Sequence, residues 1–253
     1  MTLDPHFDDA HAPGESRRAA REGLGVALAT SAYGVSFGAL AVASGLDIWQ
    51  TCVLSLFMFT GGSQFAFVGV IAGGGLAAAP AAIASSALLG VRNVAYGLRM
   101  SPVIGPGALR RTAAAQFTID ESTAVSLAQT TPRARLVGFW ATGLGIYLGW
   151  NLFTLVGALL GDVLGDVRAY GLDAAAAAAF LALLWPRLKQ RQAIAVGVAS
   201  AVVATVLTPV LMPGIPVLIA ALVAVFVGWT NWLGHSPRPP VEQDDVPELG
   251  GLP

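Results

Sequence analysis

The 253-residue sequence is poor in charge. Only 11% of its residues are Asp, Glu, Lys or Arg, which is about half the fraction usual in soluble domains. The 14 basic and 15 acidic residues nearly cancel, so no excess of positive charge indicates a nucleic-acid partner. Between Leu24 and Leu98 the only residues with a full charge are Asp47 and Arg92, and none lies between Leu136 and Gly161. Such a chain has too few charged faces to present to water, so the composition predicts a polytopic membrane protein.

Histidine, lysine and cysteine are nearly absent, which argues against several kinds of site. The three histidines lie in the terminal segments, Lys189 is the only lysine and Cys52 is the only cysteine. The apolar segments therefore offer no imidazole for a zinc site and no His or Lys base for a serine nucleophile at Ser63. The sequence predicts no metal, no cofactor and no enzyme activity, and Cys52 alone cannot form an internal disulfide.

Long apolar runs approach the length of about 20 residues that crossing a bilayer requires, and they predict an all-α membrane helix bundle. We expect about seven or eight transmembrane segments, with one or two broken or re-entrant helices. Residues 1–22 are expected to form a cytoplasmic N-terminal segment, 23–234 the transmembrane domain and 235–253 a disordered tail rich in Pro, Asp and Glu. The expected spans are Leu24–Ser44, Thr51–Gly73, Leu76–Leu98, Leu136–Gly161, Ala174–Trp185, Ala193–Met212 and Pro216–Leu233, with Leu109–Gln129 left open as an eighth.

Two further patterns concern packing and depth. Glycines recur four residues apart, as at Gly34 and Gly38 or Gly157 and Gly161, and this spacing predicts close contact between helix backbones. Most tryptophans fall near the expected span ends, where indole prefers the headgroup layer. Trp150 lies at depth instead.

Arginine placement predicts the orientation and also raises a conflict. Arg17, Arg18 and Arg21 are expected to keep the N-terminus in the cytoplasm. Eight crossings would place the later basic clusters on the same side, but they put the loop from Arg99 to Arg111 outside with its three arginines. Either broken segments change the count or this loop violates the positive-inside rule, and the sequence leaves both open.

The first polar motif, FTGGSQF, interrupts one of the most apolar regions of the chain. Gly61 and Gly62 permit the backbone to unwind, Ser63 offers an N-cap for a second half-helix, and Gln64 offers both a donor and an acceptor. Transporters use such breaks to bind substrates and ions, because non-helical backbone inside a membrane must be buried in protein or line a cavity. A continuous helix whose glycines serve close packing is the alternative.

The second motif, VRNVAY, places a cation well inside an expected span. A charge at such depth is costly unless it is paired or hydrated. Arg92 is therefore expected to bind a substrate carboxylate, to pair with an acidic residue, or to snorkel toward the interface. Asn93 is its neighbour, and Tyr96 lies one helical turn further along the same face.

The third motif, FTIDEST, carries two adjacent acids that point about 100° apart around a helix. Asp120 or Glu121 is expected to pair with Arg92, bind a substrate ammonium or accept a proton, and a helix lying at the interface with both acids in water is the alternative. A cation, two carboxylates and a polar break suit a zwitterion better than a sugar. The similar character of this segment and the Gly62 break leaves open an inverted repeat that relates them.

Taken in order, FTGGSQF, LLGVRNVAYGLRMSP and FTIDEST resemble the AzlC family of branched-chain amino acid exporter subunits. Its members typically carry G-[AG]-S-Q-F, R-[NH]-x-x-Y-[GS] and D-E-[ST] elements, which here are residues 61–65, 92–97 and 120–122. The resemblance covers roughly Arg18 to Leu233. Asn93 stands where many relatives carry His, so a family-wide histidine proton relay is not expected in this chain.

The resemblance implies a multi-pass subunit of the cell (inner) membrane that exports branched-chain or other hydrophobic amino acids. It also implies coupling to the proton gradient and a small AzlD-like membrane partner. The apolar substrate side chain is expected near Phe65 and Phe67. A membrane scaffold or channel subunit, whose motifs serve assembly with a partner, is the alternative. The expected substrate- and ion-binding residues are Gly61, Gly62, Ser63, Gln64, Arg92, Asn93, Tyr96, Asp120 and Glu121.

Overall fold

The computed structural model describes residues 12–164, 191–212 and 215–230, together with Leu181, Trp185, Leu188 and Lys189. Every regular element in these residues is a helix, which confirms the expected all-α class for the described part of the chain. Apart from Leu181 and Trp185, the expected span Ala174–Trp185 lies outside it, as does the tail 235–253. The elements are α1 (Ala12–Ser31), α2 (Tyr33–Ala43), α3 (Ile48–Phe57), α4 (Gly61–Gly74), the short 3₁₀ helix η1 (Gly75–Ala78), α5 (Ala79–Gly90), α6 (Arg92–Ile104), α7 (Ala108–Gln116), α8 (Asp120–Leu127), α9 (Pro132–Leu164), α11 (Arg191–Leu207) and α12 (Ile215–Thr230).

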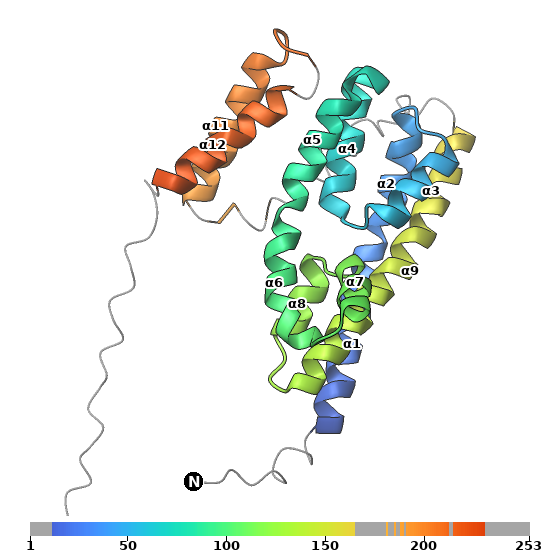
Figure 1. Cartoon of the computed structure of the whole chain (residues 1–253). Coiled ribbons are helices and arrows are strands. Elements are labelled where there is room, and N and C mark those ends of the chain that lie inside the picture. Colours follow the sequence, from blue (N-terminus) through green and yellow to red (C-terminus); the bar gives the residue numbers. More distant parts are fainter. Residues whose placement is uncertain are drawn as a thin grey trace, which may run out of the picture.

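Two long helical rods form the spine of the molecule. Helices α1 and α2 make one rod with a single turn at Ala32, and this rod packs along α9 over most of its length (Figure 1). A Cβ atom on Gly38 would collide with the Thr154 carbonyl, and one on Gly157 would collide with the Val35 carbonyl. The predicted glycine spacing therefore serves direct backbone contact between the two rods.

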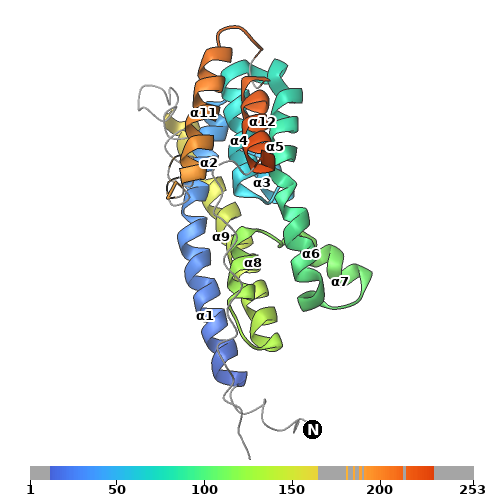
Figure 2. The same ribbon diagram turned by 90° about the vertical axis from the view of Figure 1, so that its left-hand side faces the viewer.

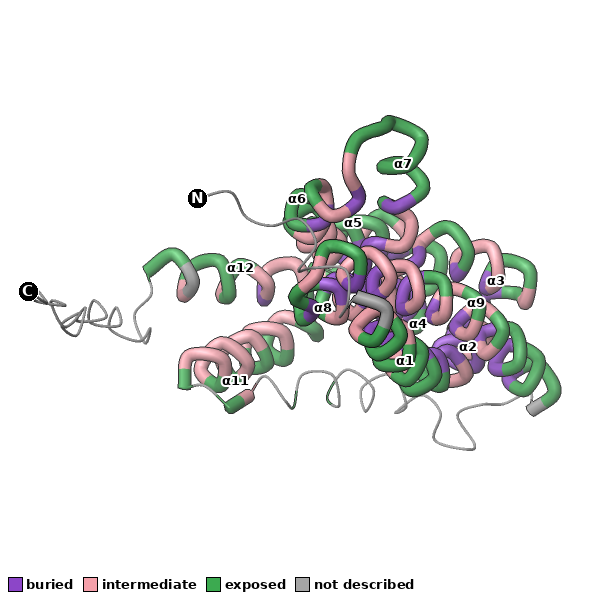
Figure 3. Tube along the Cα trace, turned by 90° about the horizontal axis from the view of Figure 1, so that it is seen from below, coloured by how far each residue is buried: buried purple, intermediate pink, exposed green. Residues whose placement is uncertain are grey.

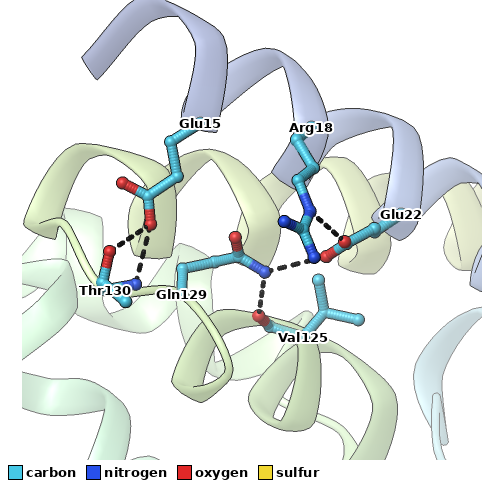
Figure 4. A network of polar contacts seen from close by, with 6 residues as sticks. All are labelled: Glu15, Arg18, Glu22, Val125, Gln129 and Thr130. Atoms are coloured by element: carbon cyan, nitrogen blue, oxygen red, sulfur yellow. Dashed lines mark hydrogen bonds and ion pairs between the residues drawn. The ribbon is translucent and has the colours of Figure 1, made fainter. Parts of the chain in front are cut away.

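Polar contacts join the start of the α1–α2 rod to the loop before α9 (Figure 4). The Glu15 carboxylate accepts hydrogen bonds from the Thr130 amide at 2.8 Å and the Thr130 hydroxyl at 2.6 Å. Glu22 accepts one from Gln129 at 3.0 Å and forms an ion pair with Arg18 at 2.8 Å. Half of the expected N-terminal segment is thus helical, and it is attached to the bundle end at which α9 begins.

Two of the expected spans are interrupted helices. The stretch Thr51–Gly73 is not one continuous span, because α3 ends at Phe57 and α4 begins at Gly61. The break lies at residues 58–60, just before the predicted glycine pair, which occupies the first turn of α4. The open segment Leu109–Gln129 is interrupted in the same way, with residues 117–119 between α7 and α8.

The first eight helices form two similar units of opposite direction. Each unit consists of a rod followed by a broken hairpin: α1–α2 with α3–α4, then α5–α6 with α7–α8. Gly45, with φ +95°, follows the first rod, and Gly105, with φ +83°, follows the second. The α1–α2 rod and the α5–α6 rod run in opposite directions, and the two hairpins occupy opposite halves of the bundle (Figures 1 and 2). This is the arrangement of an inverted repeat.

The hairpins change how the basic residues are distributed. Because each hairpin enters and leaves its own half of the bundle, α1 begins, α6 ends and α9 begins at one common end, and α7 lies in that half (Figure 1). The end of α6 and all of α7 thus lie in the same half of the bundle as the start of α1. The segments at this end carry eight arginines: Arg17, Arg18, Arg21, Arg99, Arg110, Arg111, Arg133 and Arg135.

The described residues contain three helical stretches that are long and apolar enough to cross a membrane: Gly14–Ala43, Gly61–Ile104 and Pro132–Val163. The second includes a turn at Gly75, so α4 and α5 lie side by side. The expected count of seven or eight spans is not confirmed. Helices α11 and α12 correspond to the last two expected spans, and they pack together through a 3.1 Å hydrogen bond from Ser200 to the Ala220 carbonyl.

Burial is concentrated where the α1–α2 rod and α9 meet α4 (Figure 3). In α7 all residues are exposed except Ala114, which is buried, and Gln116, which is half-buried. Large apolar side chains cover much of the outer surface, among them Leu98, Leu148 and Trp229. A soluble monomer rarely exposes so much apolar surface, so this surface indicates a lipid environment.

We predict that Gly157→Ala destabilises the spine while Gly73→Ala does not. The first substitution forces a Cβ against the Val35 carbonyl, whereas nothing lies within 4 Å of a Cβ on Gly73. Overpacking of this kind costs about 2 kcal/mol, so the apparent melting temperature of purified Gly157→Ala should fall by several degrees. Equal melting temperatures for the two variants would contradict the backbone contact described here.

Candidate functional site

The two helix breaks meet in the middle of the bundle. Gln116, the last residue of α7, donates through Nε2 to the carbonyl of Leu56 near the end of α3, at 2.9 Å. The ring of Tyr147 on α9 contacts a phenylalanine from each break, with centroid distances of 5.0 Å to Phe59 and 5.3 Å to Phe117. Residues of FTGGSQF and FTIDEST, which are far apart in the sequence, therefore lie against a common residue.

Gln64 closes the first break from inside the protein. Its side chain is completely buried, and Nε2 donates to the Met58 carbonyl at 2.7 Å and to the Ser55 carbonyl at 3.3 Å. Its Oε1 accepts from the indole nitrogen of Trp150 at 2.8 Å. These bonds satisfy carbonyls at the C-terminal end of α3, so Gln64 stabilises the break and is occupied by protein groups.

Trp150 supports the same break from α9. A Cβ on Gly61 would come within 3.1 Å of its indole ring, so the glycine at this position gives the ring room. Its ring also packs against Phe37 and Phe65, at centroid distances of 6.2 and 6.3 Å. Phe65 is only 2% exposed and packs in this core. Sequence reasoning placed Trp150 at depth but gave it no role. A buried indole N–H needs an acceptor, which was the available signal.

Ser122 plays the corresponding part at the second break. Its hydroxyl donates to the Phe117 carbonyl at 2.7 Å and accepts from the Ile119 amide at 3.1 Å. Ser122 is fully buried and lies in the first turn of α8. Each break is therefore held by a buried polar side chain from the helix that follows it.

Arg92 lies between the two half-helix N-termini. It begins α6, and its Nε is 3.3 Å from Oδ1 of Asp120, the first residue of α8. Its Nη2 would be 2.9 Å from a Cβ on Gly62 in the first turn of α4. The predicted pairing of Arg92 with one of the two acids is thus confirmed, and the pair uses Asp120. The side chains are 37% and 28% exposed, so the ion pair is neither fully buried nor free in solvent.

Two buried polar atoms on residues next to Gly62 and Arg92 have no hydrogen-bond partner among the described residues: Ser63 Oγ and Asn93 Oδ1. Arg92 Nε contacts Asp120 in the ion pair. Ser63 is 1% exposed and forms no cap, so the expectation that it caps the second half-helix is wrong. Buried polar groups are rarely left unpaired in proteins. Unpaired donors and acceptors beside a half-exposed ion pair are what a small polar ligand would satisfy.

The remaining predicted residues lie beside this centre. Glu121 follows Asp120 in the first turn of α8 and is half-buried. Tyr96 is half-buried one turn along α6 from Arg92. Within the residues the structure describes, no three His, Cys, Asp or Glu side chains are grouped closely enough to hold a metal ion. The arrangement thus offers a positive end, made by α4 and Arg92, next to a negative end, made by Asp120 and Glu121.

Comparison with known proteins bears on this arrangement. The family model described as AzlC protein matches residues 25–164, which is more than half of the chain and includes all three motifs. The matched residues cover α2 to α9 and the last part of α1. Neither a curated protein nor a solved structure matched the chain.

We predict that Gln64→Leu and Trp150→Phe have coupled effects on stability. Gln64→Leu removes the side-chain donor to the Ser55 carbonyl and the acceptor of the Trp150 indole N–H, while the Met58 carbonyl keeps its bond from the Thr60 amide at 2.7 Å. Trp150→Phe removes the donor to Gln64. Each unsatisfied buried group costs about 1–3 kcal/mol. Both single variants should therefore melt earlier, and the double variant should lose less than the sum because the two share one hydrogen bond.

Trp229→Phe is the matched control, because that tryptophan is 89% exposed and its substitution should leave the melting temperature unchanged. Strictly additive losses for the Gln64 and Trp150 substitutions would show that the two residues do not act together.

Proposed function

Because the chain belongs to the AzlC family, whose members are membrane proteins linked to branched-chain amino acid transport, we propose that it is a secondary transporter subunit. In this proposal it exports branched-chain or other hydrophobic amino acids across the cell (inner) membrane. The family is of the transporter type, and the proposal assigns no catalytic residue.

One observation carries the proposal: two broken helices meet at a charged centre inside an apolar bundle. Broken helices in transporters present half-helix N-termini to anionic substrate groups near the membrane midplane. Here α4 and α8 begin on either side of Arg92, next to Asp120 and Glu121. An amino acid carries both charges within a few ångströms, so it matches a centre that has a positive and a negative end.

Coupling to protons is assigned to the acidic end of the centre. Asp120 and Glu121 are the carboxylates in the first turn of α8, and the described spans contain no histidine. A carboxylate that loses its ion-pair partner in a poorly solvated site binds a proton more readily. In this proposal a substrate carboxylate competes with Asp120 for Arg92, and Asp120 or Glu121 carries the coupled proton.

Orientation and partner complete the proposal. The end of the bundle that carries the eight arginines is assigned to the cytoplasm, in agreement with the positive-inside rule. A small AzlD-like membrane subunit is proposed to assemble with the chain, as the family relationship suggests.

The direct test is efflux of labelled valine, leucine and isoleucine from preloaded cells. Cells expressing the chain together with the small subunit should lose label faster than empty-vector cells, and dissipation of the proton gradient should remove the difference. Efflux that matches the empty vector for every hydrophobic amino acid would contradict the proposal. Assembly of a stable two-subunit complex without any efflux would favour the scaffold alternative.

We predict that Arg92→Ala and Glu121→Gln each reduce valine efflux at least tenfold while membrane abundance stays unchanged. A tenfold loss corresponds to about 1.4 kcal/mol, a modest value for a charged contact. Arg99→Ala is the matched control, because Arg99 lies on the same helix but is exposed. Efflux retained by either variant would remove that residue from the site.

A further inference from the structure

The two hairpins of the inverted repeat differ at one pair of positions. Each break carries Phe-Thr, as Phe59-Thr60 and Phe117-Thr118, and each following half-helix carries a buried serine in its first turn, Ser63 or Ser122. The two residues before the serine are Gly61-Gly62 in the first hairpin and Asp120-Glu121 in the second. The first turn of α8 thus contains two acids, and the first turn of α4 contains none.

This difference matters because of what the start of a helix requires. The first N–H groups of a helix have no partner within the helix, and the helix dipole favours an anion beside them. In α8 the chain supplies the anions itself. In α4 no side chain caps the N-terminus, and the buried hydroxyl of Ser63 has no partner among the described residues.

Arg92 adds a full positive charge to the start of α4. Its Nη2 lies next to Gly62, where a side chain would meet it at 2.9 Å. Two positive partners, the helix end and the guanidinium, face each other here without an acidic residue in the same turn. Asp120 contacts Arg92 at Nε, on another nitrogen of the guanidinium, so an anion placed beside Nη2 would be attracted by both the guanidinium and the start of α4.

We infer that the N-terminus of α4 binds the carboxylate of the transported amino acid, in the place that Asp120 and Glu121 take at α8. The first-turn amides and the Ser63 hydroxyl donate hydrogen bonds, and Arg92 supplies the counter-charge. Because Gly61 and Gly62 carry no side chains, none of their own atoms stands between a carboxylate and the first-turn amides. This inference rests on the proposed function and fixes the direction of the substrate: carboxylate toward α4, ammonium toward α8.

The ligand class follows from this orientation. A free α-carboxylate is required, so an amino acid amide or the corresponding amine should not bind, although its apolar side chain is unchanged. A site built on buried donors rejects analogues that leave those donors unpaired.

The sharpest test introduces into the first turn of α4 an acidic residue like those in the first turn of α8. Gly62→Asp places a tethered carboxylate at the start of α4, and Gly62→Asn places a similar volume there without the charge. In thermal-shift measurements on the purified transporter without substrate, the Asp variant should melt several degrees above the Asn variant. Saturating valine should raise the melting temperature of the unmodified protein but not that of the Asp variant. Equal melting temperatures for the two variants, or a valine shift retained by the Asp variant, would overturn the inference.

A ligand series separates this inference from the proposed function. Valine should stabilise the unmodified protein, valinamide and isobutylamine should not, and Ser63→Ala should weaken valine binding about tenfold. If valinamide stabilises as well as valine, the carboxylate site is wrong although transport of hydrophobic amines or amino acids stands. If labelled valine, leucine and isoleucine are neither bound nor exported, the proposed function itself fails.

Discussion

The structure depends on satisfying the backbone groups that are freed where a helix breaks inside an apolar bundle. A lipid interior offers no water to these groups, so each break survives only if protein groups replace the missing hydrogen bonds. Gln64 does this for the end of α3, and Ser122 does it for the turn before α8. Once the carbonyl side of the first break is occupied by Gln64, its N–H side at α4 is left for other groups. Arg92 lies beside that N-terminus, but a guanidinium has only donors and cannot accept from these N–H groups.

The sequence allowed much of the centre to be predicted, for identifiable physical reasons. Charges are so rare in the apolar segments that Arg92, Asp120 and Glu121 stood out, and a buried cation needs an acidic partner. The role of Gln64 could not be assigned, because an amide that binds substrate and one that binds a broken backbone look alike in sequence. The break was expected at the glycines themselves, but the unwound residues precede them. The glycines are needed for the space they leave to Trp150 and Arg92, not only for their flexibility.

The arrangement of the chain across the bundle was less accessible to sequence reasoning. A hairpin that enters and leaves on one side has the same hydropathy as a helix that crosses the membrane, because both are apolar over similar lengths. Hydropathy alone therefore cannot distinguish them. Counting hairpins as crossings sent the loop from Arg99 to Arg111 to the opposite side from the other arginines. With the hairpins confined to their halves, α1, α6 and α9 meet at one end, and the conflict with the positive-inside rule disappears.

The contact between the α1–α2 rod and α9 has a mechanical consequence. Where side chains separate two helices, rotamer changes let the helices slide or tilt by small steps. At Gly38 and Gly157 the backbones touch directly, so no rotamers are present to absorb such a movement. The α1–α2 rod and α9 therefore act as a rigid frame with a fixed crossing angle. The movement that the proposed transport requires would then come from parts with looser packing, of which the largely exposed α7 is the clearest.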